Sequence, residues 1–282
     1  MIVIRLKRAI ALFSAAILLA AALHIGAKSV FNSEPVEGVR VPVLMYHHIL
    51  RDKKYWNTYV ISPEELERDL KYIKENGYTT VVISDLVNYT QGGAELPEKP
   101  LMITFDDGYL STLSYALPLL EKYGMRGVVS VIGKYSELYS DAEDRHVSYA
   151  HLSWEDLRQM QESGVFEVQN HTYDMHKNKR GERRGAKKQS GESSEHYKKA
   201  FCEDVSHTQR LLAEKSGITP LCFTYPFGMI SDDSLELVRE LGFRASLSCE
   251  EGVSVVTRDP DSLFLLKRCN RPHNKSAEKI LN

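Results

Sequence analysis

The chain of 282 residues lacks an excess of either charge, and it lacks closely paired cysteines. Its 36 lysines and arginines nearly balance its 38 aspartates and glutamates, giving a formal net charge of −2. That balance gives no reason to expect nucleic acid as a partner. None of the four cysteines belongs to a Cys-x-x-Cys pair, so a structural zinc site is not expected. A hydrophobic share of 43% and a charged share of 26% are those of an ordinary globular protein.

The cysteines leave two interpretations open. Outside the membrane, Cys202, Cys222, Cys249 and Cys269 are permitted to form disulfides, with three complete pairings possible. Cys222 also falls in a predicted strand and Cys249 directly follows one, and a free cysteine there packs as a small buried hydrophobe.

A basic and then apolar segment begins the chain. Arg5, Lys7 and Arg8 precede an uncharged apolar run over residues 9–27. A spanning helix needs about 20 apolar residues, and a cleavable signal peptide has the same order of basic and apolar parts. Because Ile25 occupies a position where cleavage needs a small residue, we expect a signal anchor over residues 1–27 and a linker over 28–40. The remaining chain then lies outside the cell membrane on a single-pass anchor, or is secreted if the segment is cleaved.

Short β-branched runs alternate with amphipathic helical stretches over residues 41–282. Strands are predicted at residues 43–46, 80–83, 101–105, 128–132, 166–170, 221–225, 243–248 and 264–268. Ser62, Ser153 and Ser231 are predicted to begin helices, because each serine precedes an apolar stripe at helical spacing. About eight such units predict an α/β fold, a closed or nearly closed (β/α) barrel.

Polar residues follow the predicted strands directly. His47, Asp106, Asp107, His171 and the turn at 226–228 each come just after a strand. The carboxyl ends of parallel strands lie at one end of a barrel, where active sites of such folds are found. We therefore expect these residues to share one site.

Two aspartates and two histidines offer the chemistry of a metal hydrolase. One acid and two imidazoles, Asp107 with His171 and His176, make a three-ligand set for a divalent metal such as zinc, with positions left open. Asp106 is then free to act as a base. The histidines lie five residues apart, which does not match one helix face and predicts an irregular loop.

The sequence indicates the roles of residues near this ligand set less clearly. Asp174 lies between the two histidines and is a candidate to orient one of them by a hydrogen bond. His47 has a pKa suited to protonating a leaving group, whereas His48 is expected only to form hydrogen bonds across the barrel mouth. The polar, mostly basic stretch 177–195 is predicted to be a mobile, solvated loop, with an anionic polymer or lipid headgroups as the less favoured alternative.

These motifs together resemble a known family. Thr104–Tyr109 (Thr-Phe-Asp-Asp-Gly-Tyr), Asn170–His176 (Asn-His-Thr-Tyr-Asp-Met-His) and Phe223–Gly228 (Phe-Thr-Tyr-Pro-Phe-Gly) look like the successive motifs of NodB-type polysaccharide deacetylases, carbohydrate esterase family 4. The opening stretch Val41–His48 (Val-Pro-Val-Leu-Met-Tyr-His-His) resembles the circularly permuted branch, which includes poly-N-acetylglucosamine deacetylases of bacterial biofilms. The resemblance covers roughly residues 41–272.

The resemblance implies a distorted (β/α)7–8 barrel and a role for each site residue. By that resemblance Asp107, His171 and His176 bind the metal, and Asp106 is the catalytic base. The backbone N–H of Phe227 would help bind the oxyanion, and Thr172 would support the metal-site loop. His47 would stand where the permuted branch places its catalytic acid.

The sequence departs from the wider family at two places. An arginine often found two residues before the proline of the third motif is here Thr224, and the Asp-x-x-Asp-Trp motif has no counterpart near 246–251. Arg268 and Arg271 are the candidates to replace that arginine beside Asp106.

The predicted function is therefore metal-dependent hydrolysis of N-acetyl groups on a cell-surface polysaccharide built from N-acetylglucosamine. The cofactor is a divalent metal, with zinc favoured by the His₂Asp set. The partners are the polysaccharide and, through the N-terminal segment, the membrane. Two alternatives are a glycosidase, although paired carboxylates there flank a bond about 5–9.5 Å apart, and an anchored glycan-binding module of the same fold.

Overall fold

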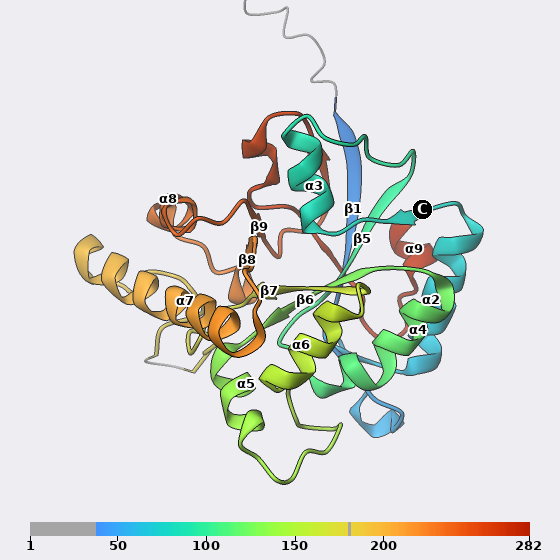
Figure 1. The fold of residues 1–282 in the computed structure, drawn as a ribbon, viewed down its shortest axis with the longest axis horizontal. Helices are drawn as coiled ribbons and strands as arrows, with labels where there is room; N and C mark the ends of the chain where they lie inside the picture. The colour runs from blue at the N-terminus through green and yellow to red at the C-terminus, as the bar shows by residue number, and fades with distance from the viewer. Residues whose placement is uncertain (1–37, 180–181) are drawn as a thin grey trace, which may run out of the picture. The chain divides into compact units, whose positions relative to one another are not determined.

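A curled, mainly parallel β-sheet runs through the centre of the protein, and helices surround it (Figure 1). The computed structural model describes residues 38–179 and 182–282. The order of neighbouring strands is β10 (Val253–Val256), β1 (Val39–Tyr46), β5 (Pro100–Phe105), β6 (Gly127–Val131), β7 (Phe166–Asn170), β8 (Cys222–Thr224) and β9 (Ala245–Leu247). All pairs from β1 to β9 are parallel, and β10 is antiparallel to β1.

Short strands extend the main sheet and form a second, two-stranded sheet. Strand β4 (Thr79–Thr80) pairs with β5, and β2 (His48–Ile49) pairs with β3 (Val60–Ile61) in a separate two-stranded sheet. The segment 266–270 contacts both sides of the curl. Leu266 forms a parallel bridge to Leu247 of β9, and β11 (Cys269–Asn270) runs parallel to β1. This α/β architecture with a curled sheet agrees with the predicted fold class.

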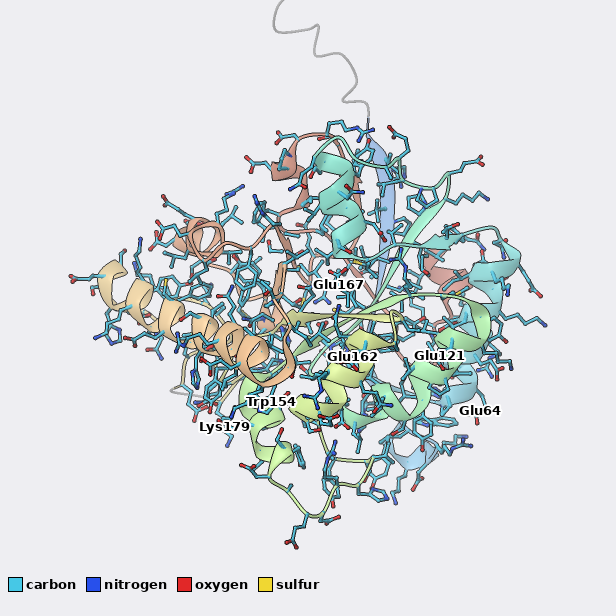
Figure 2. The ribbon with its side chains drawn as sticks, in the orientation of Figure 1. Glu64, Glu121, Trp154, Glu162, Glu167 and Lys179 are labelled. Atoms are coloured by element: carbon cyan, nitrogen blue, oxygen red, sulfur yellow. The ribbon has the colours of Figure 1, made fainter. Side chains whose placement is uncertain are left out.

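Helices cover the outside of the sheet. They are α2 (Pro63–Glu75), α3 (Ile83–Thr90), α4 (Leu117–Tyr123), α5 (Gly133–Ser140), α6 (Trp154–Glu162), α7 (Ser194–Ser216), α8 (Asp232–Glu240) and α9 (Ala277–Leu281). The predicted starts after Ser62, Ser153 and Ser231 are confirmed. Exposed glutamates such as Glu64 and Glu121 point outward from α2 and α4 (Figure 2).

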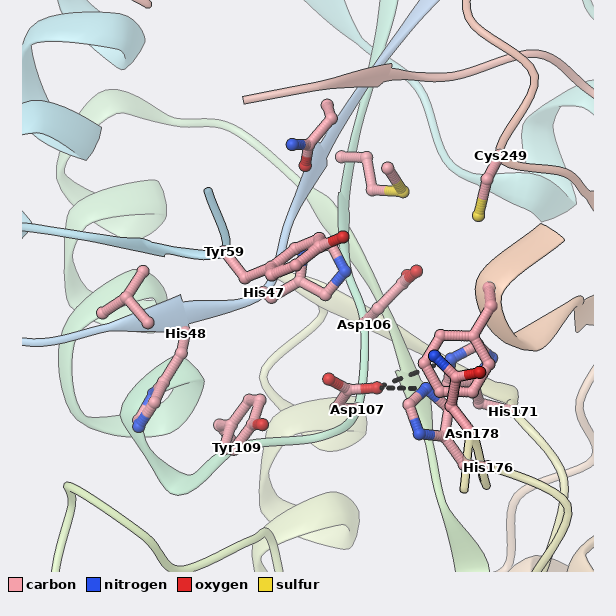
Figure 3. A pocket seen from close by; sticks show the side chains of 14 residues that line it. His47, His48, Tyr59, Asp106, Asp107, Tyr109, His171, His176, Asn178 and Cys249 are labelled. Atoms are coloured by element: carbon pink, nitrogen blue, oxygen red, sulfur yellow. Dashed lines mark ion pairs between the residues drawn. The ribbon is translucent and has the colours of Figure 1, made fainter. Parts of the chain in front are cut away.

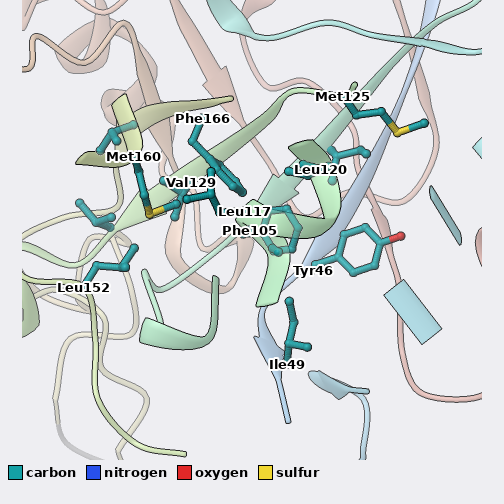
Figure 4. Close-up of a cluster of buried hydrophobic side chains, with 14 of the residues drawn as sticks. Tyr46, Ile49, Phe105, Leu117, Leu120, Met125, Val129, Leu152, Met160 and Phe166 are labelled. Carbon is teal, nitrogen blue, oxygen red and sulfur yellow. The ribbon is translucent and has the colours of Figure 1, made fainter. Parts of the chain in front are cut away.

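The largest group of buried apolar residues lies between the sheet and helices α2, α4 and α6 (Figure 4). Phe105 is at its centre, because its ring stacks on Tyr46 at 5.3 Å between centroids and meets the edge of Phe166 at 5.5 Å. Strand β5 is buried over its whole length, as expected for a parallel strand covered on both faces. The core therefore fixes the strand that ends at Asp106 and Asp107.

Two strand predictions were wrong. Residues 80–83 do not continue as a strand, because Asp85 accepts a hydrogen bond from the Val82 N–H and begins helix α3 at Ile83. Residues 264–268 form only the single bridge at Leu266, because Leu265 has a φ of 58° that interrupts an extended chain. The regular pairing starts later, at β11.

The N-terminal prediction lies mostly outside the described residues, which begin at residue 38. Strand β1 already includes Val39 and Arg40, so the sheet starts two residues earlier than the predicted linker boundary. No helix within residues 38–179 or 182–282 combines the length and apolarity that a bilayer crossing requires.

Candidate metal and catalytic site

A cavity of about 580 Å³ opens at the carboxyl ends of the parallel strands (Figure 3). All six residues for which the sequence predicts a direct role line it. They are His47 after β1, Asp106 and Asp107 after β5, His171 and His176 after β7, and Phe227 after β8. Side chains from four different strand ends therefore meet in one place.

Asp107, His171 and His176 have the geometry of a metal-ligand set. The Asp107 Oδ1 atom lies 3.1 Å from Nε2 of His176 and 3.5 Å from Nε2 of His171 (Figure 3). One donor atom from each residue lies within 4.8 Å of the others. Asp107 and His171 are buried, and His176 is half-buried.

The hydrogen bonds around this set leave its donor atoms free. The Nδ1 atom of His171 lies 2.7 Å from the carbonyl oxygen of Thr224, so Nδ1 carries the proton and Nε2 presents its lone pair. Asp107 Oδ1 is buried without a hydrogen-bond partner. A buried carboxylate oxygen is costly unless it is satisfied, and a divalent cation among these three atoms satisfies it. The residues therefore fit a metal such as zinc, whose ligands include imidazole nitrogen and carboxylate oxygen.

The backbone at Asp107 has a strained conformation, and a hydrogen bond from another segment of the chain stabilises it. Asp107 has a φ of 71°, and His151 Nδ1 donates to its carbonyl oxygen at 2.9 Å. Gly108 also has a positive φ, and a Cβ there would come within 2.9 Å of Val131 Cγ1. Left-handed conformations in non-glycine residues cost about 1–3 kcal/mol and persist where the surroundings impose them. No pattern in the sequence indicated that His151 supports this turn.

Asp106 faces an arginine. Arg268 donates from Nη1 and Nη2 to the two oxygens of Asp106 at 2.7 and 2.8 Å, and both side chains are buried. Burial by itself raises the pKa of Asp106, but the charge and hydrogen bonds of Arg268 outweigh burial and hold that pKa below its usual value. Of the two arginines proposed from the sequence, Arg268 is therefore the one beside Asp106. Arg271 instead pairs with Glu65 and Asp69.

His47 lies across the cavity with Tyr59 against its ring (Figure 3). Its Nδ1 atom is buried without a hydrogen-bond partner. Burial lowers the pKa of His47, while the nearby carboxylates of Asp106 and Asp107 work in the opposite direction. The side chain lines the same cavity as the metal-ligand set and is not committed to a structural hydrogen bond.

His48 and Asp174 have structural partners. The two ring nitrogens of His48 lie 2.7 Å from Ser111 Oγ and 3.2 Å from the carbonyl oxygen of Ser148, so the expectation of hydrogen bonds for His48 is confirmed. The expectation that Asp174 orients a histidine is wrong. Its carboxylate pairs with Lys134 and Lys177, and a backbone carbonyl orients His171 instead.

The loop between the histidines is irregular, as their spacing predicts. Thr172 has a φ of 74°, and its N–H donates to the side chain of Asn170. Most described residues of the stretch 177–195 are exposed, as expected of a solvated loop, but residues 185–186 are buried against the body. Ala186 is fully buried, its carbonyl oxygen accepts from Tyr197, and Gly185 packs against the backbone of Pro226.

The four cysteines are free, so the disulfide alternative is wrong for this structure. Cys222 is buried, which agrees with its interpretation as a small hydrophobe, whereas Cys249, for which the same was expected, is only partly buried. Cys249 lines the cavity, with its sulfur 3.7 Å from Nη2 of Arg268.

Comparison with known proteins identifies the family. The model of the polysaccharide deacetylase family matches residues 93–246, more than half of the chain. The chain belongs to the polysaccharide deacetylase family. This membership confirms the resemblance drawn from the motifs, and the matched range includes Asp106, Asp107, His171, His176 and Phe227.

Individual members of the deacetylase family match over most of this chain. The Bacillus subtilis (strain 168) protein YxkH is 26% identical, and the match covers 76% of this chain and 66% of YxkH. The poly-beta-1,6-N-acetyl-D-glucosamine N-deacetylase of Escherichia coli O157:H7 is 22% identical, with 90% of this chain and 40% of that protein covered. The chain therefore spans less than two thirds of both curated relatives.

A solved structure from the same family shares the fold. The structure of IcaB from Ammonifex degensii superposes with a TM-score of 0.69 at 27% sequence identity. The superposition covers 86% of this chain and 96% of IcaB.

Proposed function

We propose that this protein hydrolyses N-acetyl groups on a cell-surface polysaccharide that contains N-acetylglucosamine, with the help of a divalent metal. One observation carries the proposal. Three side chains with the spacing of a metal-ligand set, Asp107, His171 and His176, face the same cavity as Asp106, whose carboxylate pairs with Arg268. The name of the E. coli relative, which specifies an N-acetylglucosamine polymer, supports the substrate class.

Asp107, His171 and His176 would hold the metal, and zinc suits this ligand set. When bound, the metal polarises the acetyl carbonyl and lowers the pKa of water to about 7. Asp106 accepts the proton of the attacking water, since Arg268 holds its carboxyl group ionised and in a fixed orientation. The backbone N–H of Phe227 stabilises the oxyanion that forms.

His47 completes the reaction by protonating the departing amine. Its ring is on the opposite wall of the cavity from His176, and its Nδ1 has no competing partner among the described residues. The products are acetate and a glucosamine unit within the polymer. Hydrolysis of an amide commonly uses one group as the base and another as the acid, and here Asp106 and His47 take these roles from opposite sides of the cavity.

We also propose the wider context expected from the sequence. The body, residues 41–282, acts outside the cell membrane, held there by the apolar segment 1–27 or secreted after its cleavage. The segment 266–270, which bridges β9 and β1, supports the description of the body as a distorted (β/α)7–8 barrel.

Acetate release tests the proposal. The purified protein would be incubated with poly-N-acetylglucosamine, peptidoglycan and chitin oligomers, each with and without a chelator. We expect acetate from at least one glycan, loss of release after chelation, and recovery on addition of zinc or another divalent metal. Glycan binding that persists after chelation without any acetate would show a binding module, and release of new reducing ends would show a glycosidase. Either outcome contradicts the proposal.

A further inference from the structure

The loop between the two histidines of the ligand set has a backbone conformation that its own sequence does not favour. Thr172 has a φ of 74°, and a β-branched residue at positive φ is a genuine outlier. Such a conformation costs about 1–3 kcal/mol and persists where the surrounding structure imposes it. Groups outside the loop must therefore hold it in place.

One carboxylate of helix α7 binds two successive peptide groups of this loop. Asp204 Oδ1 accepts a hydrogen bond from the N–H of Tyr173 at 2.8 Å, and Asp204 Oδ2 accepts one from the N–H of Asp174 at 2.8 Å. Successive backbone N–H groups that face one anion form a concave anion site of the kind called a nest. Asp204 is partly buried in this position. It therefore fixes both the place and the direction of two peptide planes.

The neighbouring contacts join the same loop to α7 and to α5. Asn170 Oδ1 accepts the N–H of Thr172 at 2.8 Å, and Asn170 Nδ2 donates to the carbonyl oxygen of Val205, which follows Asp204 on α7, at 3.0 Å. The first two residues of α5 donate their N–H groups to carbonyl oxygens of the loop. Three successive N–H groups of the loop thus end on side-chain oxygens, and two of the three depend on Asp204.

The loop keeps other contacts if Asp204 is replaced. The ring of Tyr173 meets the edge of His207 on α7, with centroids 4.4 Å apart, and its hydroxyl donates to Glu137 on α5. These side-chain contacts do not use the carboxylate of Asp204. We therefore expect a variant at this position to fold with a displaced loop.

The two histidines differ in what orients their rings. The ring of His171 is fixed by its hydrogen bond to the carbonyl oxygen of Thr224. The ring of His176 packs on Phe227, with centroids 4.3 Å apart, and the bound part of the loop ends two residues before it. The place of His176 therefore depends on the path of the loop. A displaced loop changes the 3.1 Å distance between His176 Nε2 and Asp107 Oδ1.

We propose that Asp204 is a positioning residue for the metal ligand His176, because its carboxylate fixes the loop that brings Nε2 of His176 to the other two donor atoms. This inference rests on the proposed metal-dependent function and adds a residue outside the cavity to it. Asp204 is absent from the described residues that line the cavity, so it acts through the loop and not on the substrate. Replacing a group that orients metal ligands commonly costs about 10–100-fold in metal affinity.

Zinc affinity tests the proposal. The dissociation constant would be measured by competition with a chromophoric chelator for the wild type, Asp204→Ala and Asp204→Asn. In Asp204→Ala we expect zinc to bind about 10–100-fold more weakly. Asp204→Asn keeps the shape of the side chain but has one acceptor oxygen in place of two, so its affinity should lie between the two. Glu203→Ala, which changes an exposed neighbour on the same helix, is the matched control and should bind zinc as the wild type does.

Two further measurements separate positioning from a general loss of stability. With cobalt(II) in place of zinc, visible absorption reports the geometry of the ligands, and the spectrum should change in Asp204→Ala but not in Glu203→Ala. The melting temperature of the chelated protein gives stability without metal. An Asp204→Ala protein that melts lower without metal but binds zinc with wild-type affinity would overturn the proposal. If Asp204→Ala does not fold, the same comparison with Asp204→Asn decides.

The outcomes distinguish this inference from the proposed function. Zinc binding that depends on Asp204, with no acetate released from any glycan, would refute the deacetylase activity and retain the role of Asp204. Acetate release by the wild type, with equal zinc affinity in the wild type and Asp204→Ala, would refute that role and retain the activity. A wild-type protein that binds neither zinc nor cobalt would overturn the inference.

Discussion

The carboxyl group of Asp106 lies against a guanidinium group and is shielded from solvent. Both side chains are nearly inaccessible, and two short hydrogen bonds join them. A buried ion pair gains little net stability, because desolvation of both groups offsets their attraction. Its effect here is on the carboxylate itself, since Arg268 fixes the orientation of that group and favours its ionised state.

Replacing Arg268 should therefore change the pH profile as well as the rate. A base accepts a proton only when ionised, and Arg268 lowers the pKa of Asp106. In Arg268→Met that pKa rises, so the acid limb of kcat/KM moves to higher pH, and kcat falls about 10²-fold through misplacement of the base. Arg268→Lys keeps the charge without the paired hydrogen bonds and should fall between the two. An unshifted acid limb in Arg268→Met would count against the role of this arginine.

Substitutions of the two adjacent aspartates should have different effects on metal content and turnover. Asp106→Asn keeps the shape of the side chain and leaves the metal-ligand set untouched, so metal content should remain while turnover falls about 10²–10⁴-fold. Asp107→Ala and His171→Ala remove ligands and should lose both metal and acetate release. Metal content by atomic emission, measured together with acetate release, distinguishes loss of the base from loss of a metal ligand. Full activity in Asp106→Asn would end the assignment of that residue as the base.

Site residues could be predicted from the sequence where they lie close together in the chain and follow a predicted strand. Asp106 and Asp107 follow a buried strand, and the pair His171 and His176 follows another, so their meeting could be expected from strand order alone. Arg268 is 162 residues away from Asp106 and follows an interrupted strand. The sequence therefore left Arg268 and Arg271 equivalent, and only the path of the chain at Leu265 separates them.

At the scale of elements, helix α2 anchors the segment that carries Arg268 and Arg271. Glu65 accepts hydrogen bonds from Arg271, His273 and the backbone of Asn274. Asp69, one turn later on α2, accepts from Nε of Arg271 at 2.6 Å. The capping glutamate of α2 thus also holds the chain that follows β11.

This anchoring should make stability depend on pH in the acid range. Burial acts to raise the pKa of Glu65, but its bonds to His273, Ser62, Asn274 and Arg271 lower it from 4.5 to about 2. A group whose pKa is lowered by folding contributes stability above its unfolded pKa and loses it as pH falls. The contribution is thus complete above pH 4.5 and disappears towards pH 2.

Glu65→Gln tests this dependence. At pH 7 the variant should lose about 1–3 kcal/mol of unfolding free energy, since its amide replaces a charge-assisted acceptor. The difference from wild type should shrink as pH falls below 4.5, in urea unfolding followed by circular dichroism. Glu64→Gln, on the exposed face of the same helix turn, is the control and should differ little at any pH. A constant difference down to pH 2 would contradict the ionic origin.

Element boundaries were predictable where a local signal begins or ends them. The serine caps before α2 and α6 hydrogen-bond to the third helical residue as their spacing indicates. The long helix α7 escaped prediction, since it begins inside a basic stretch and its buried face is spread over many turns. Residues 150–152 hold the Asp107 turn through backbone hydrogen bonds of Ala150 and Leu152 and through the ring of His151, and no sequence motif marks these contacts.

At the scale of the molecule, the site depends on folding of the whole sheet. The proposed metal ligands come from segments after β5 and β7, the carbonyl that orients His171 comes from β8, and the arginine comes from the segment before β11. Without a cation, folding brings the buried Asp107 carboxylate between two imidazoles and leaves one of its oxygens without a hydrogen-bond partner. A metal that binds only this assembled arrangement must stabilise the folded protein.

Metal removal should accordingly lower the melting temperature. At a free metal concentration about 100 times the dissociation constant, binding adds about 2.7 kcal/mol, which corresponds to roughly 5–10 °C for a domain of this size. Differential scanning calorimetry of the chelated and zinc-loaded protein measures the shift. Asp107→Ala should melt at one temperature in both conditions, whereas Asp106→Asn should retain the full shift because its ligands are intact. If zinc and chelator gave the wild type the same melting temperature, the three side chains would not form a metal site.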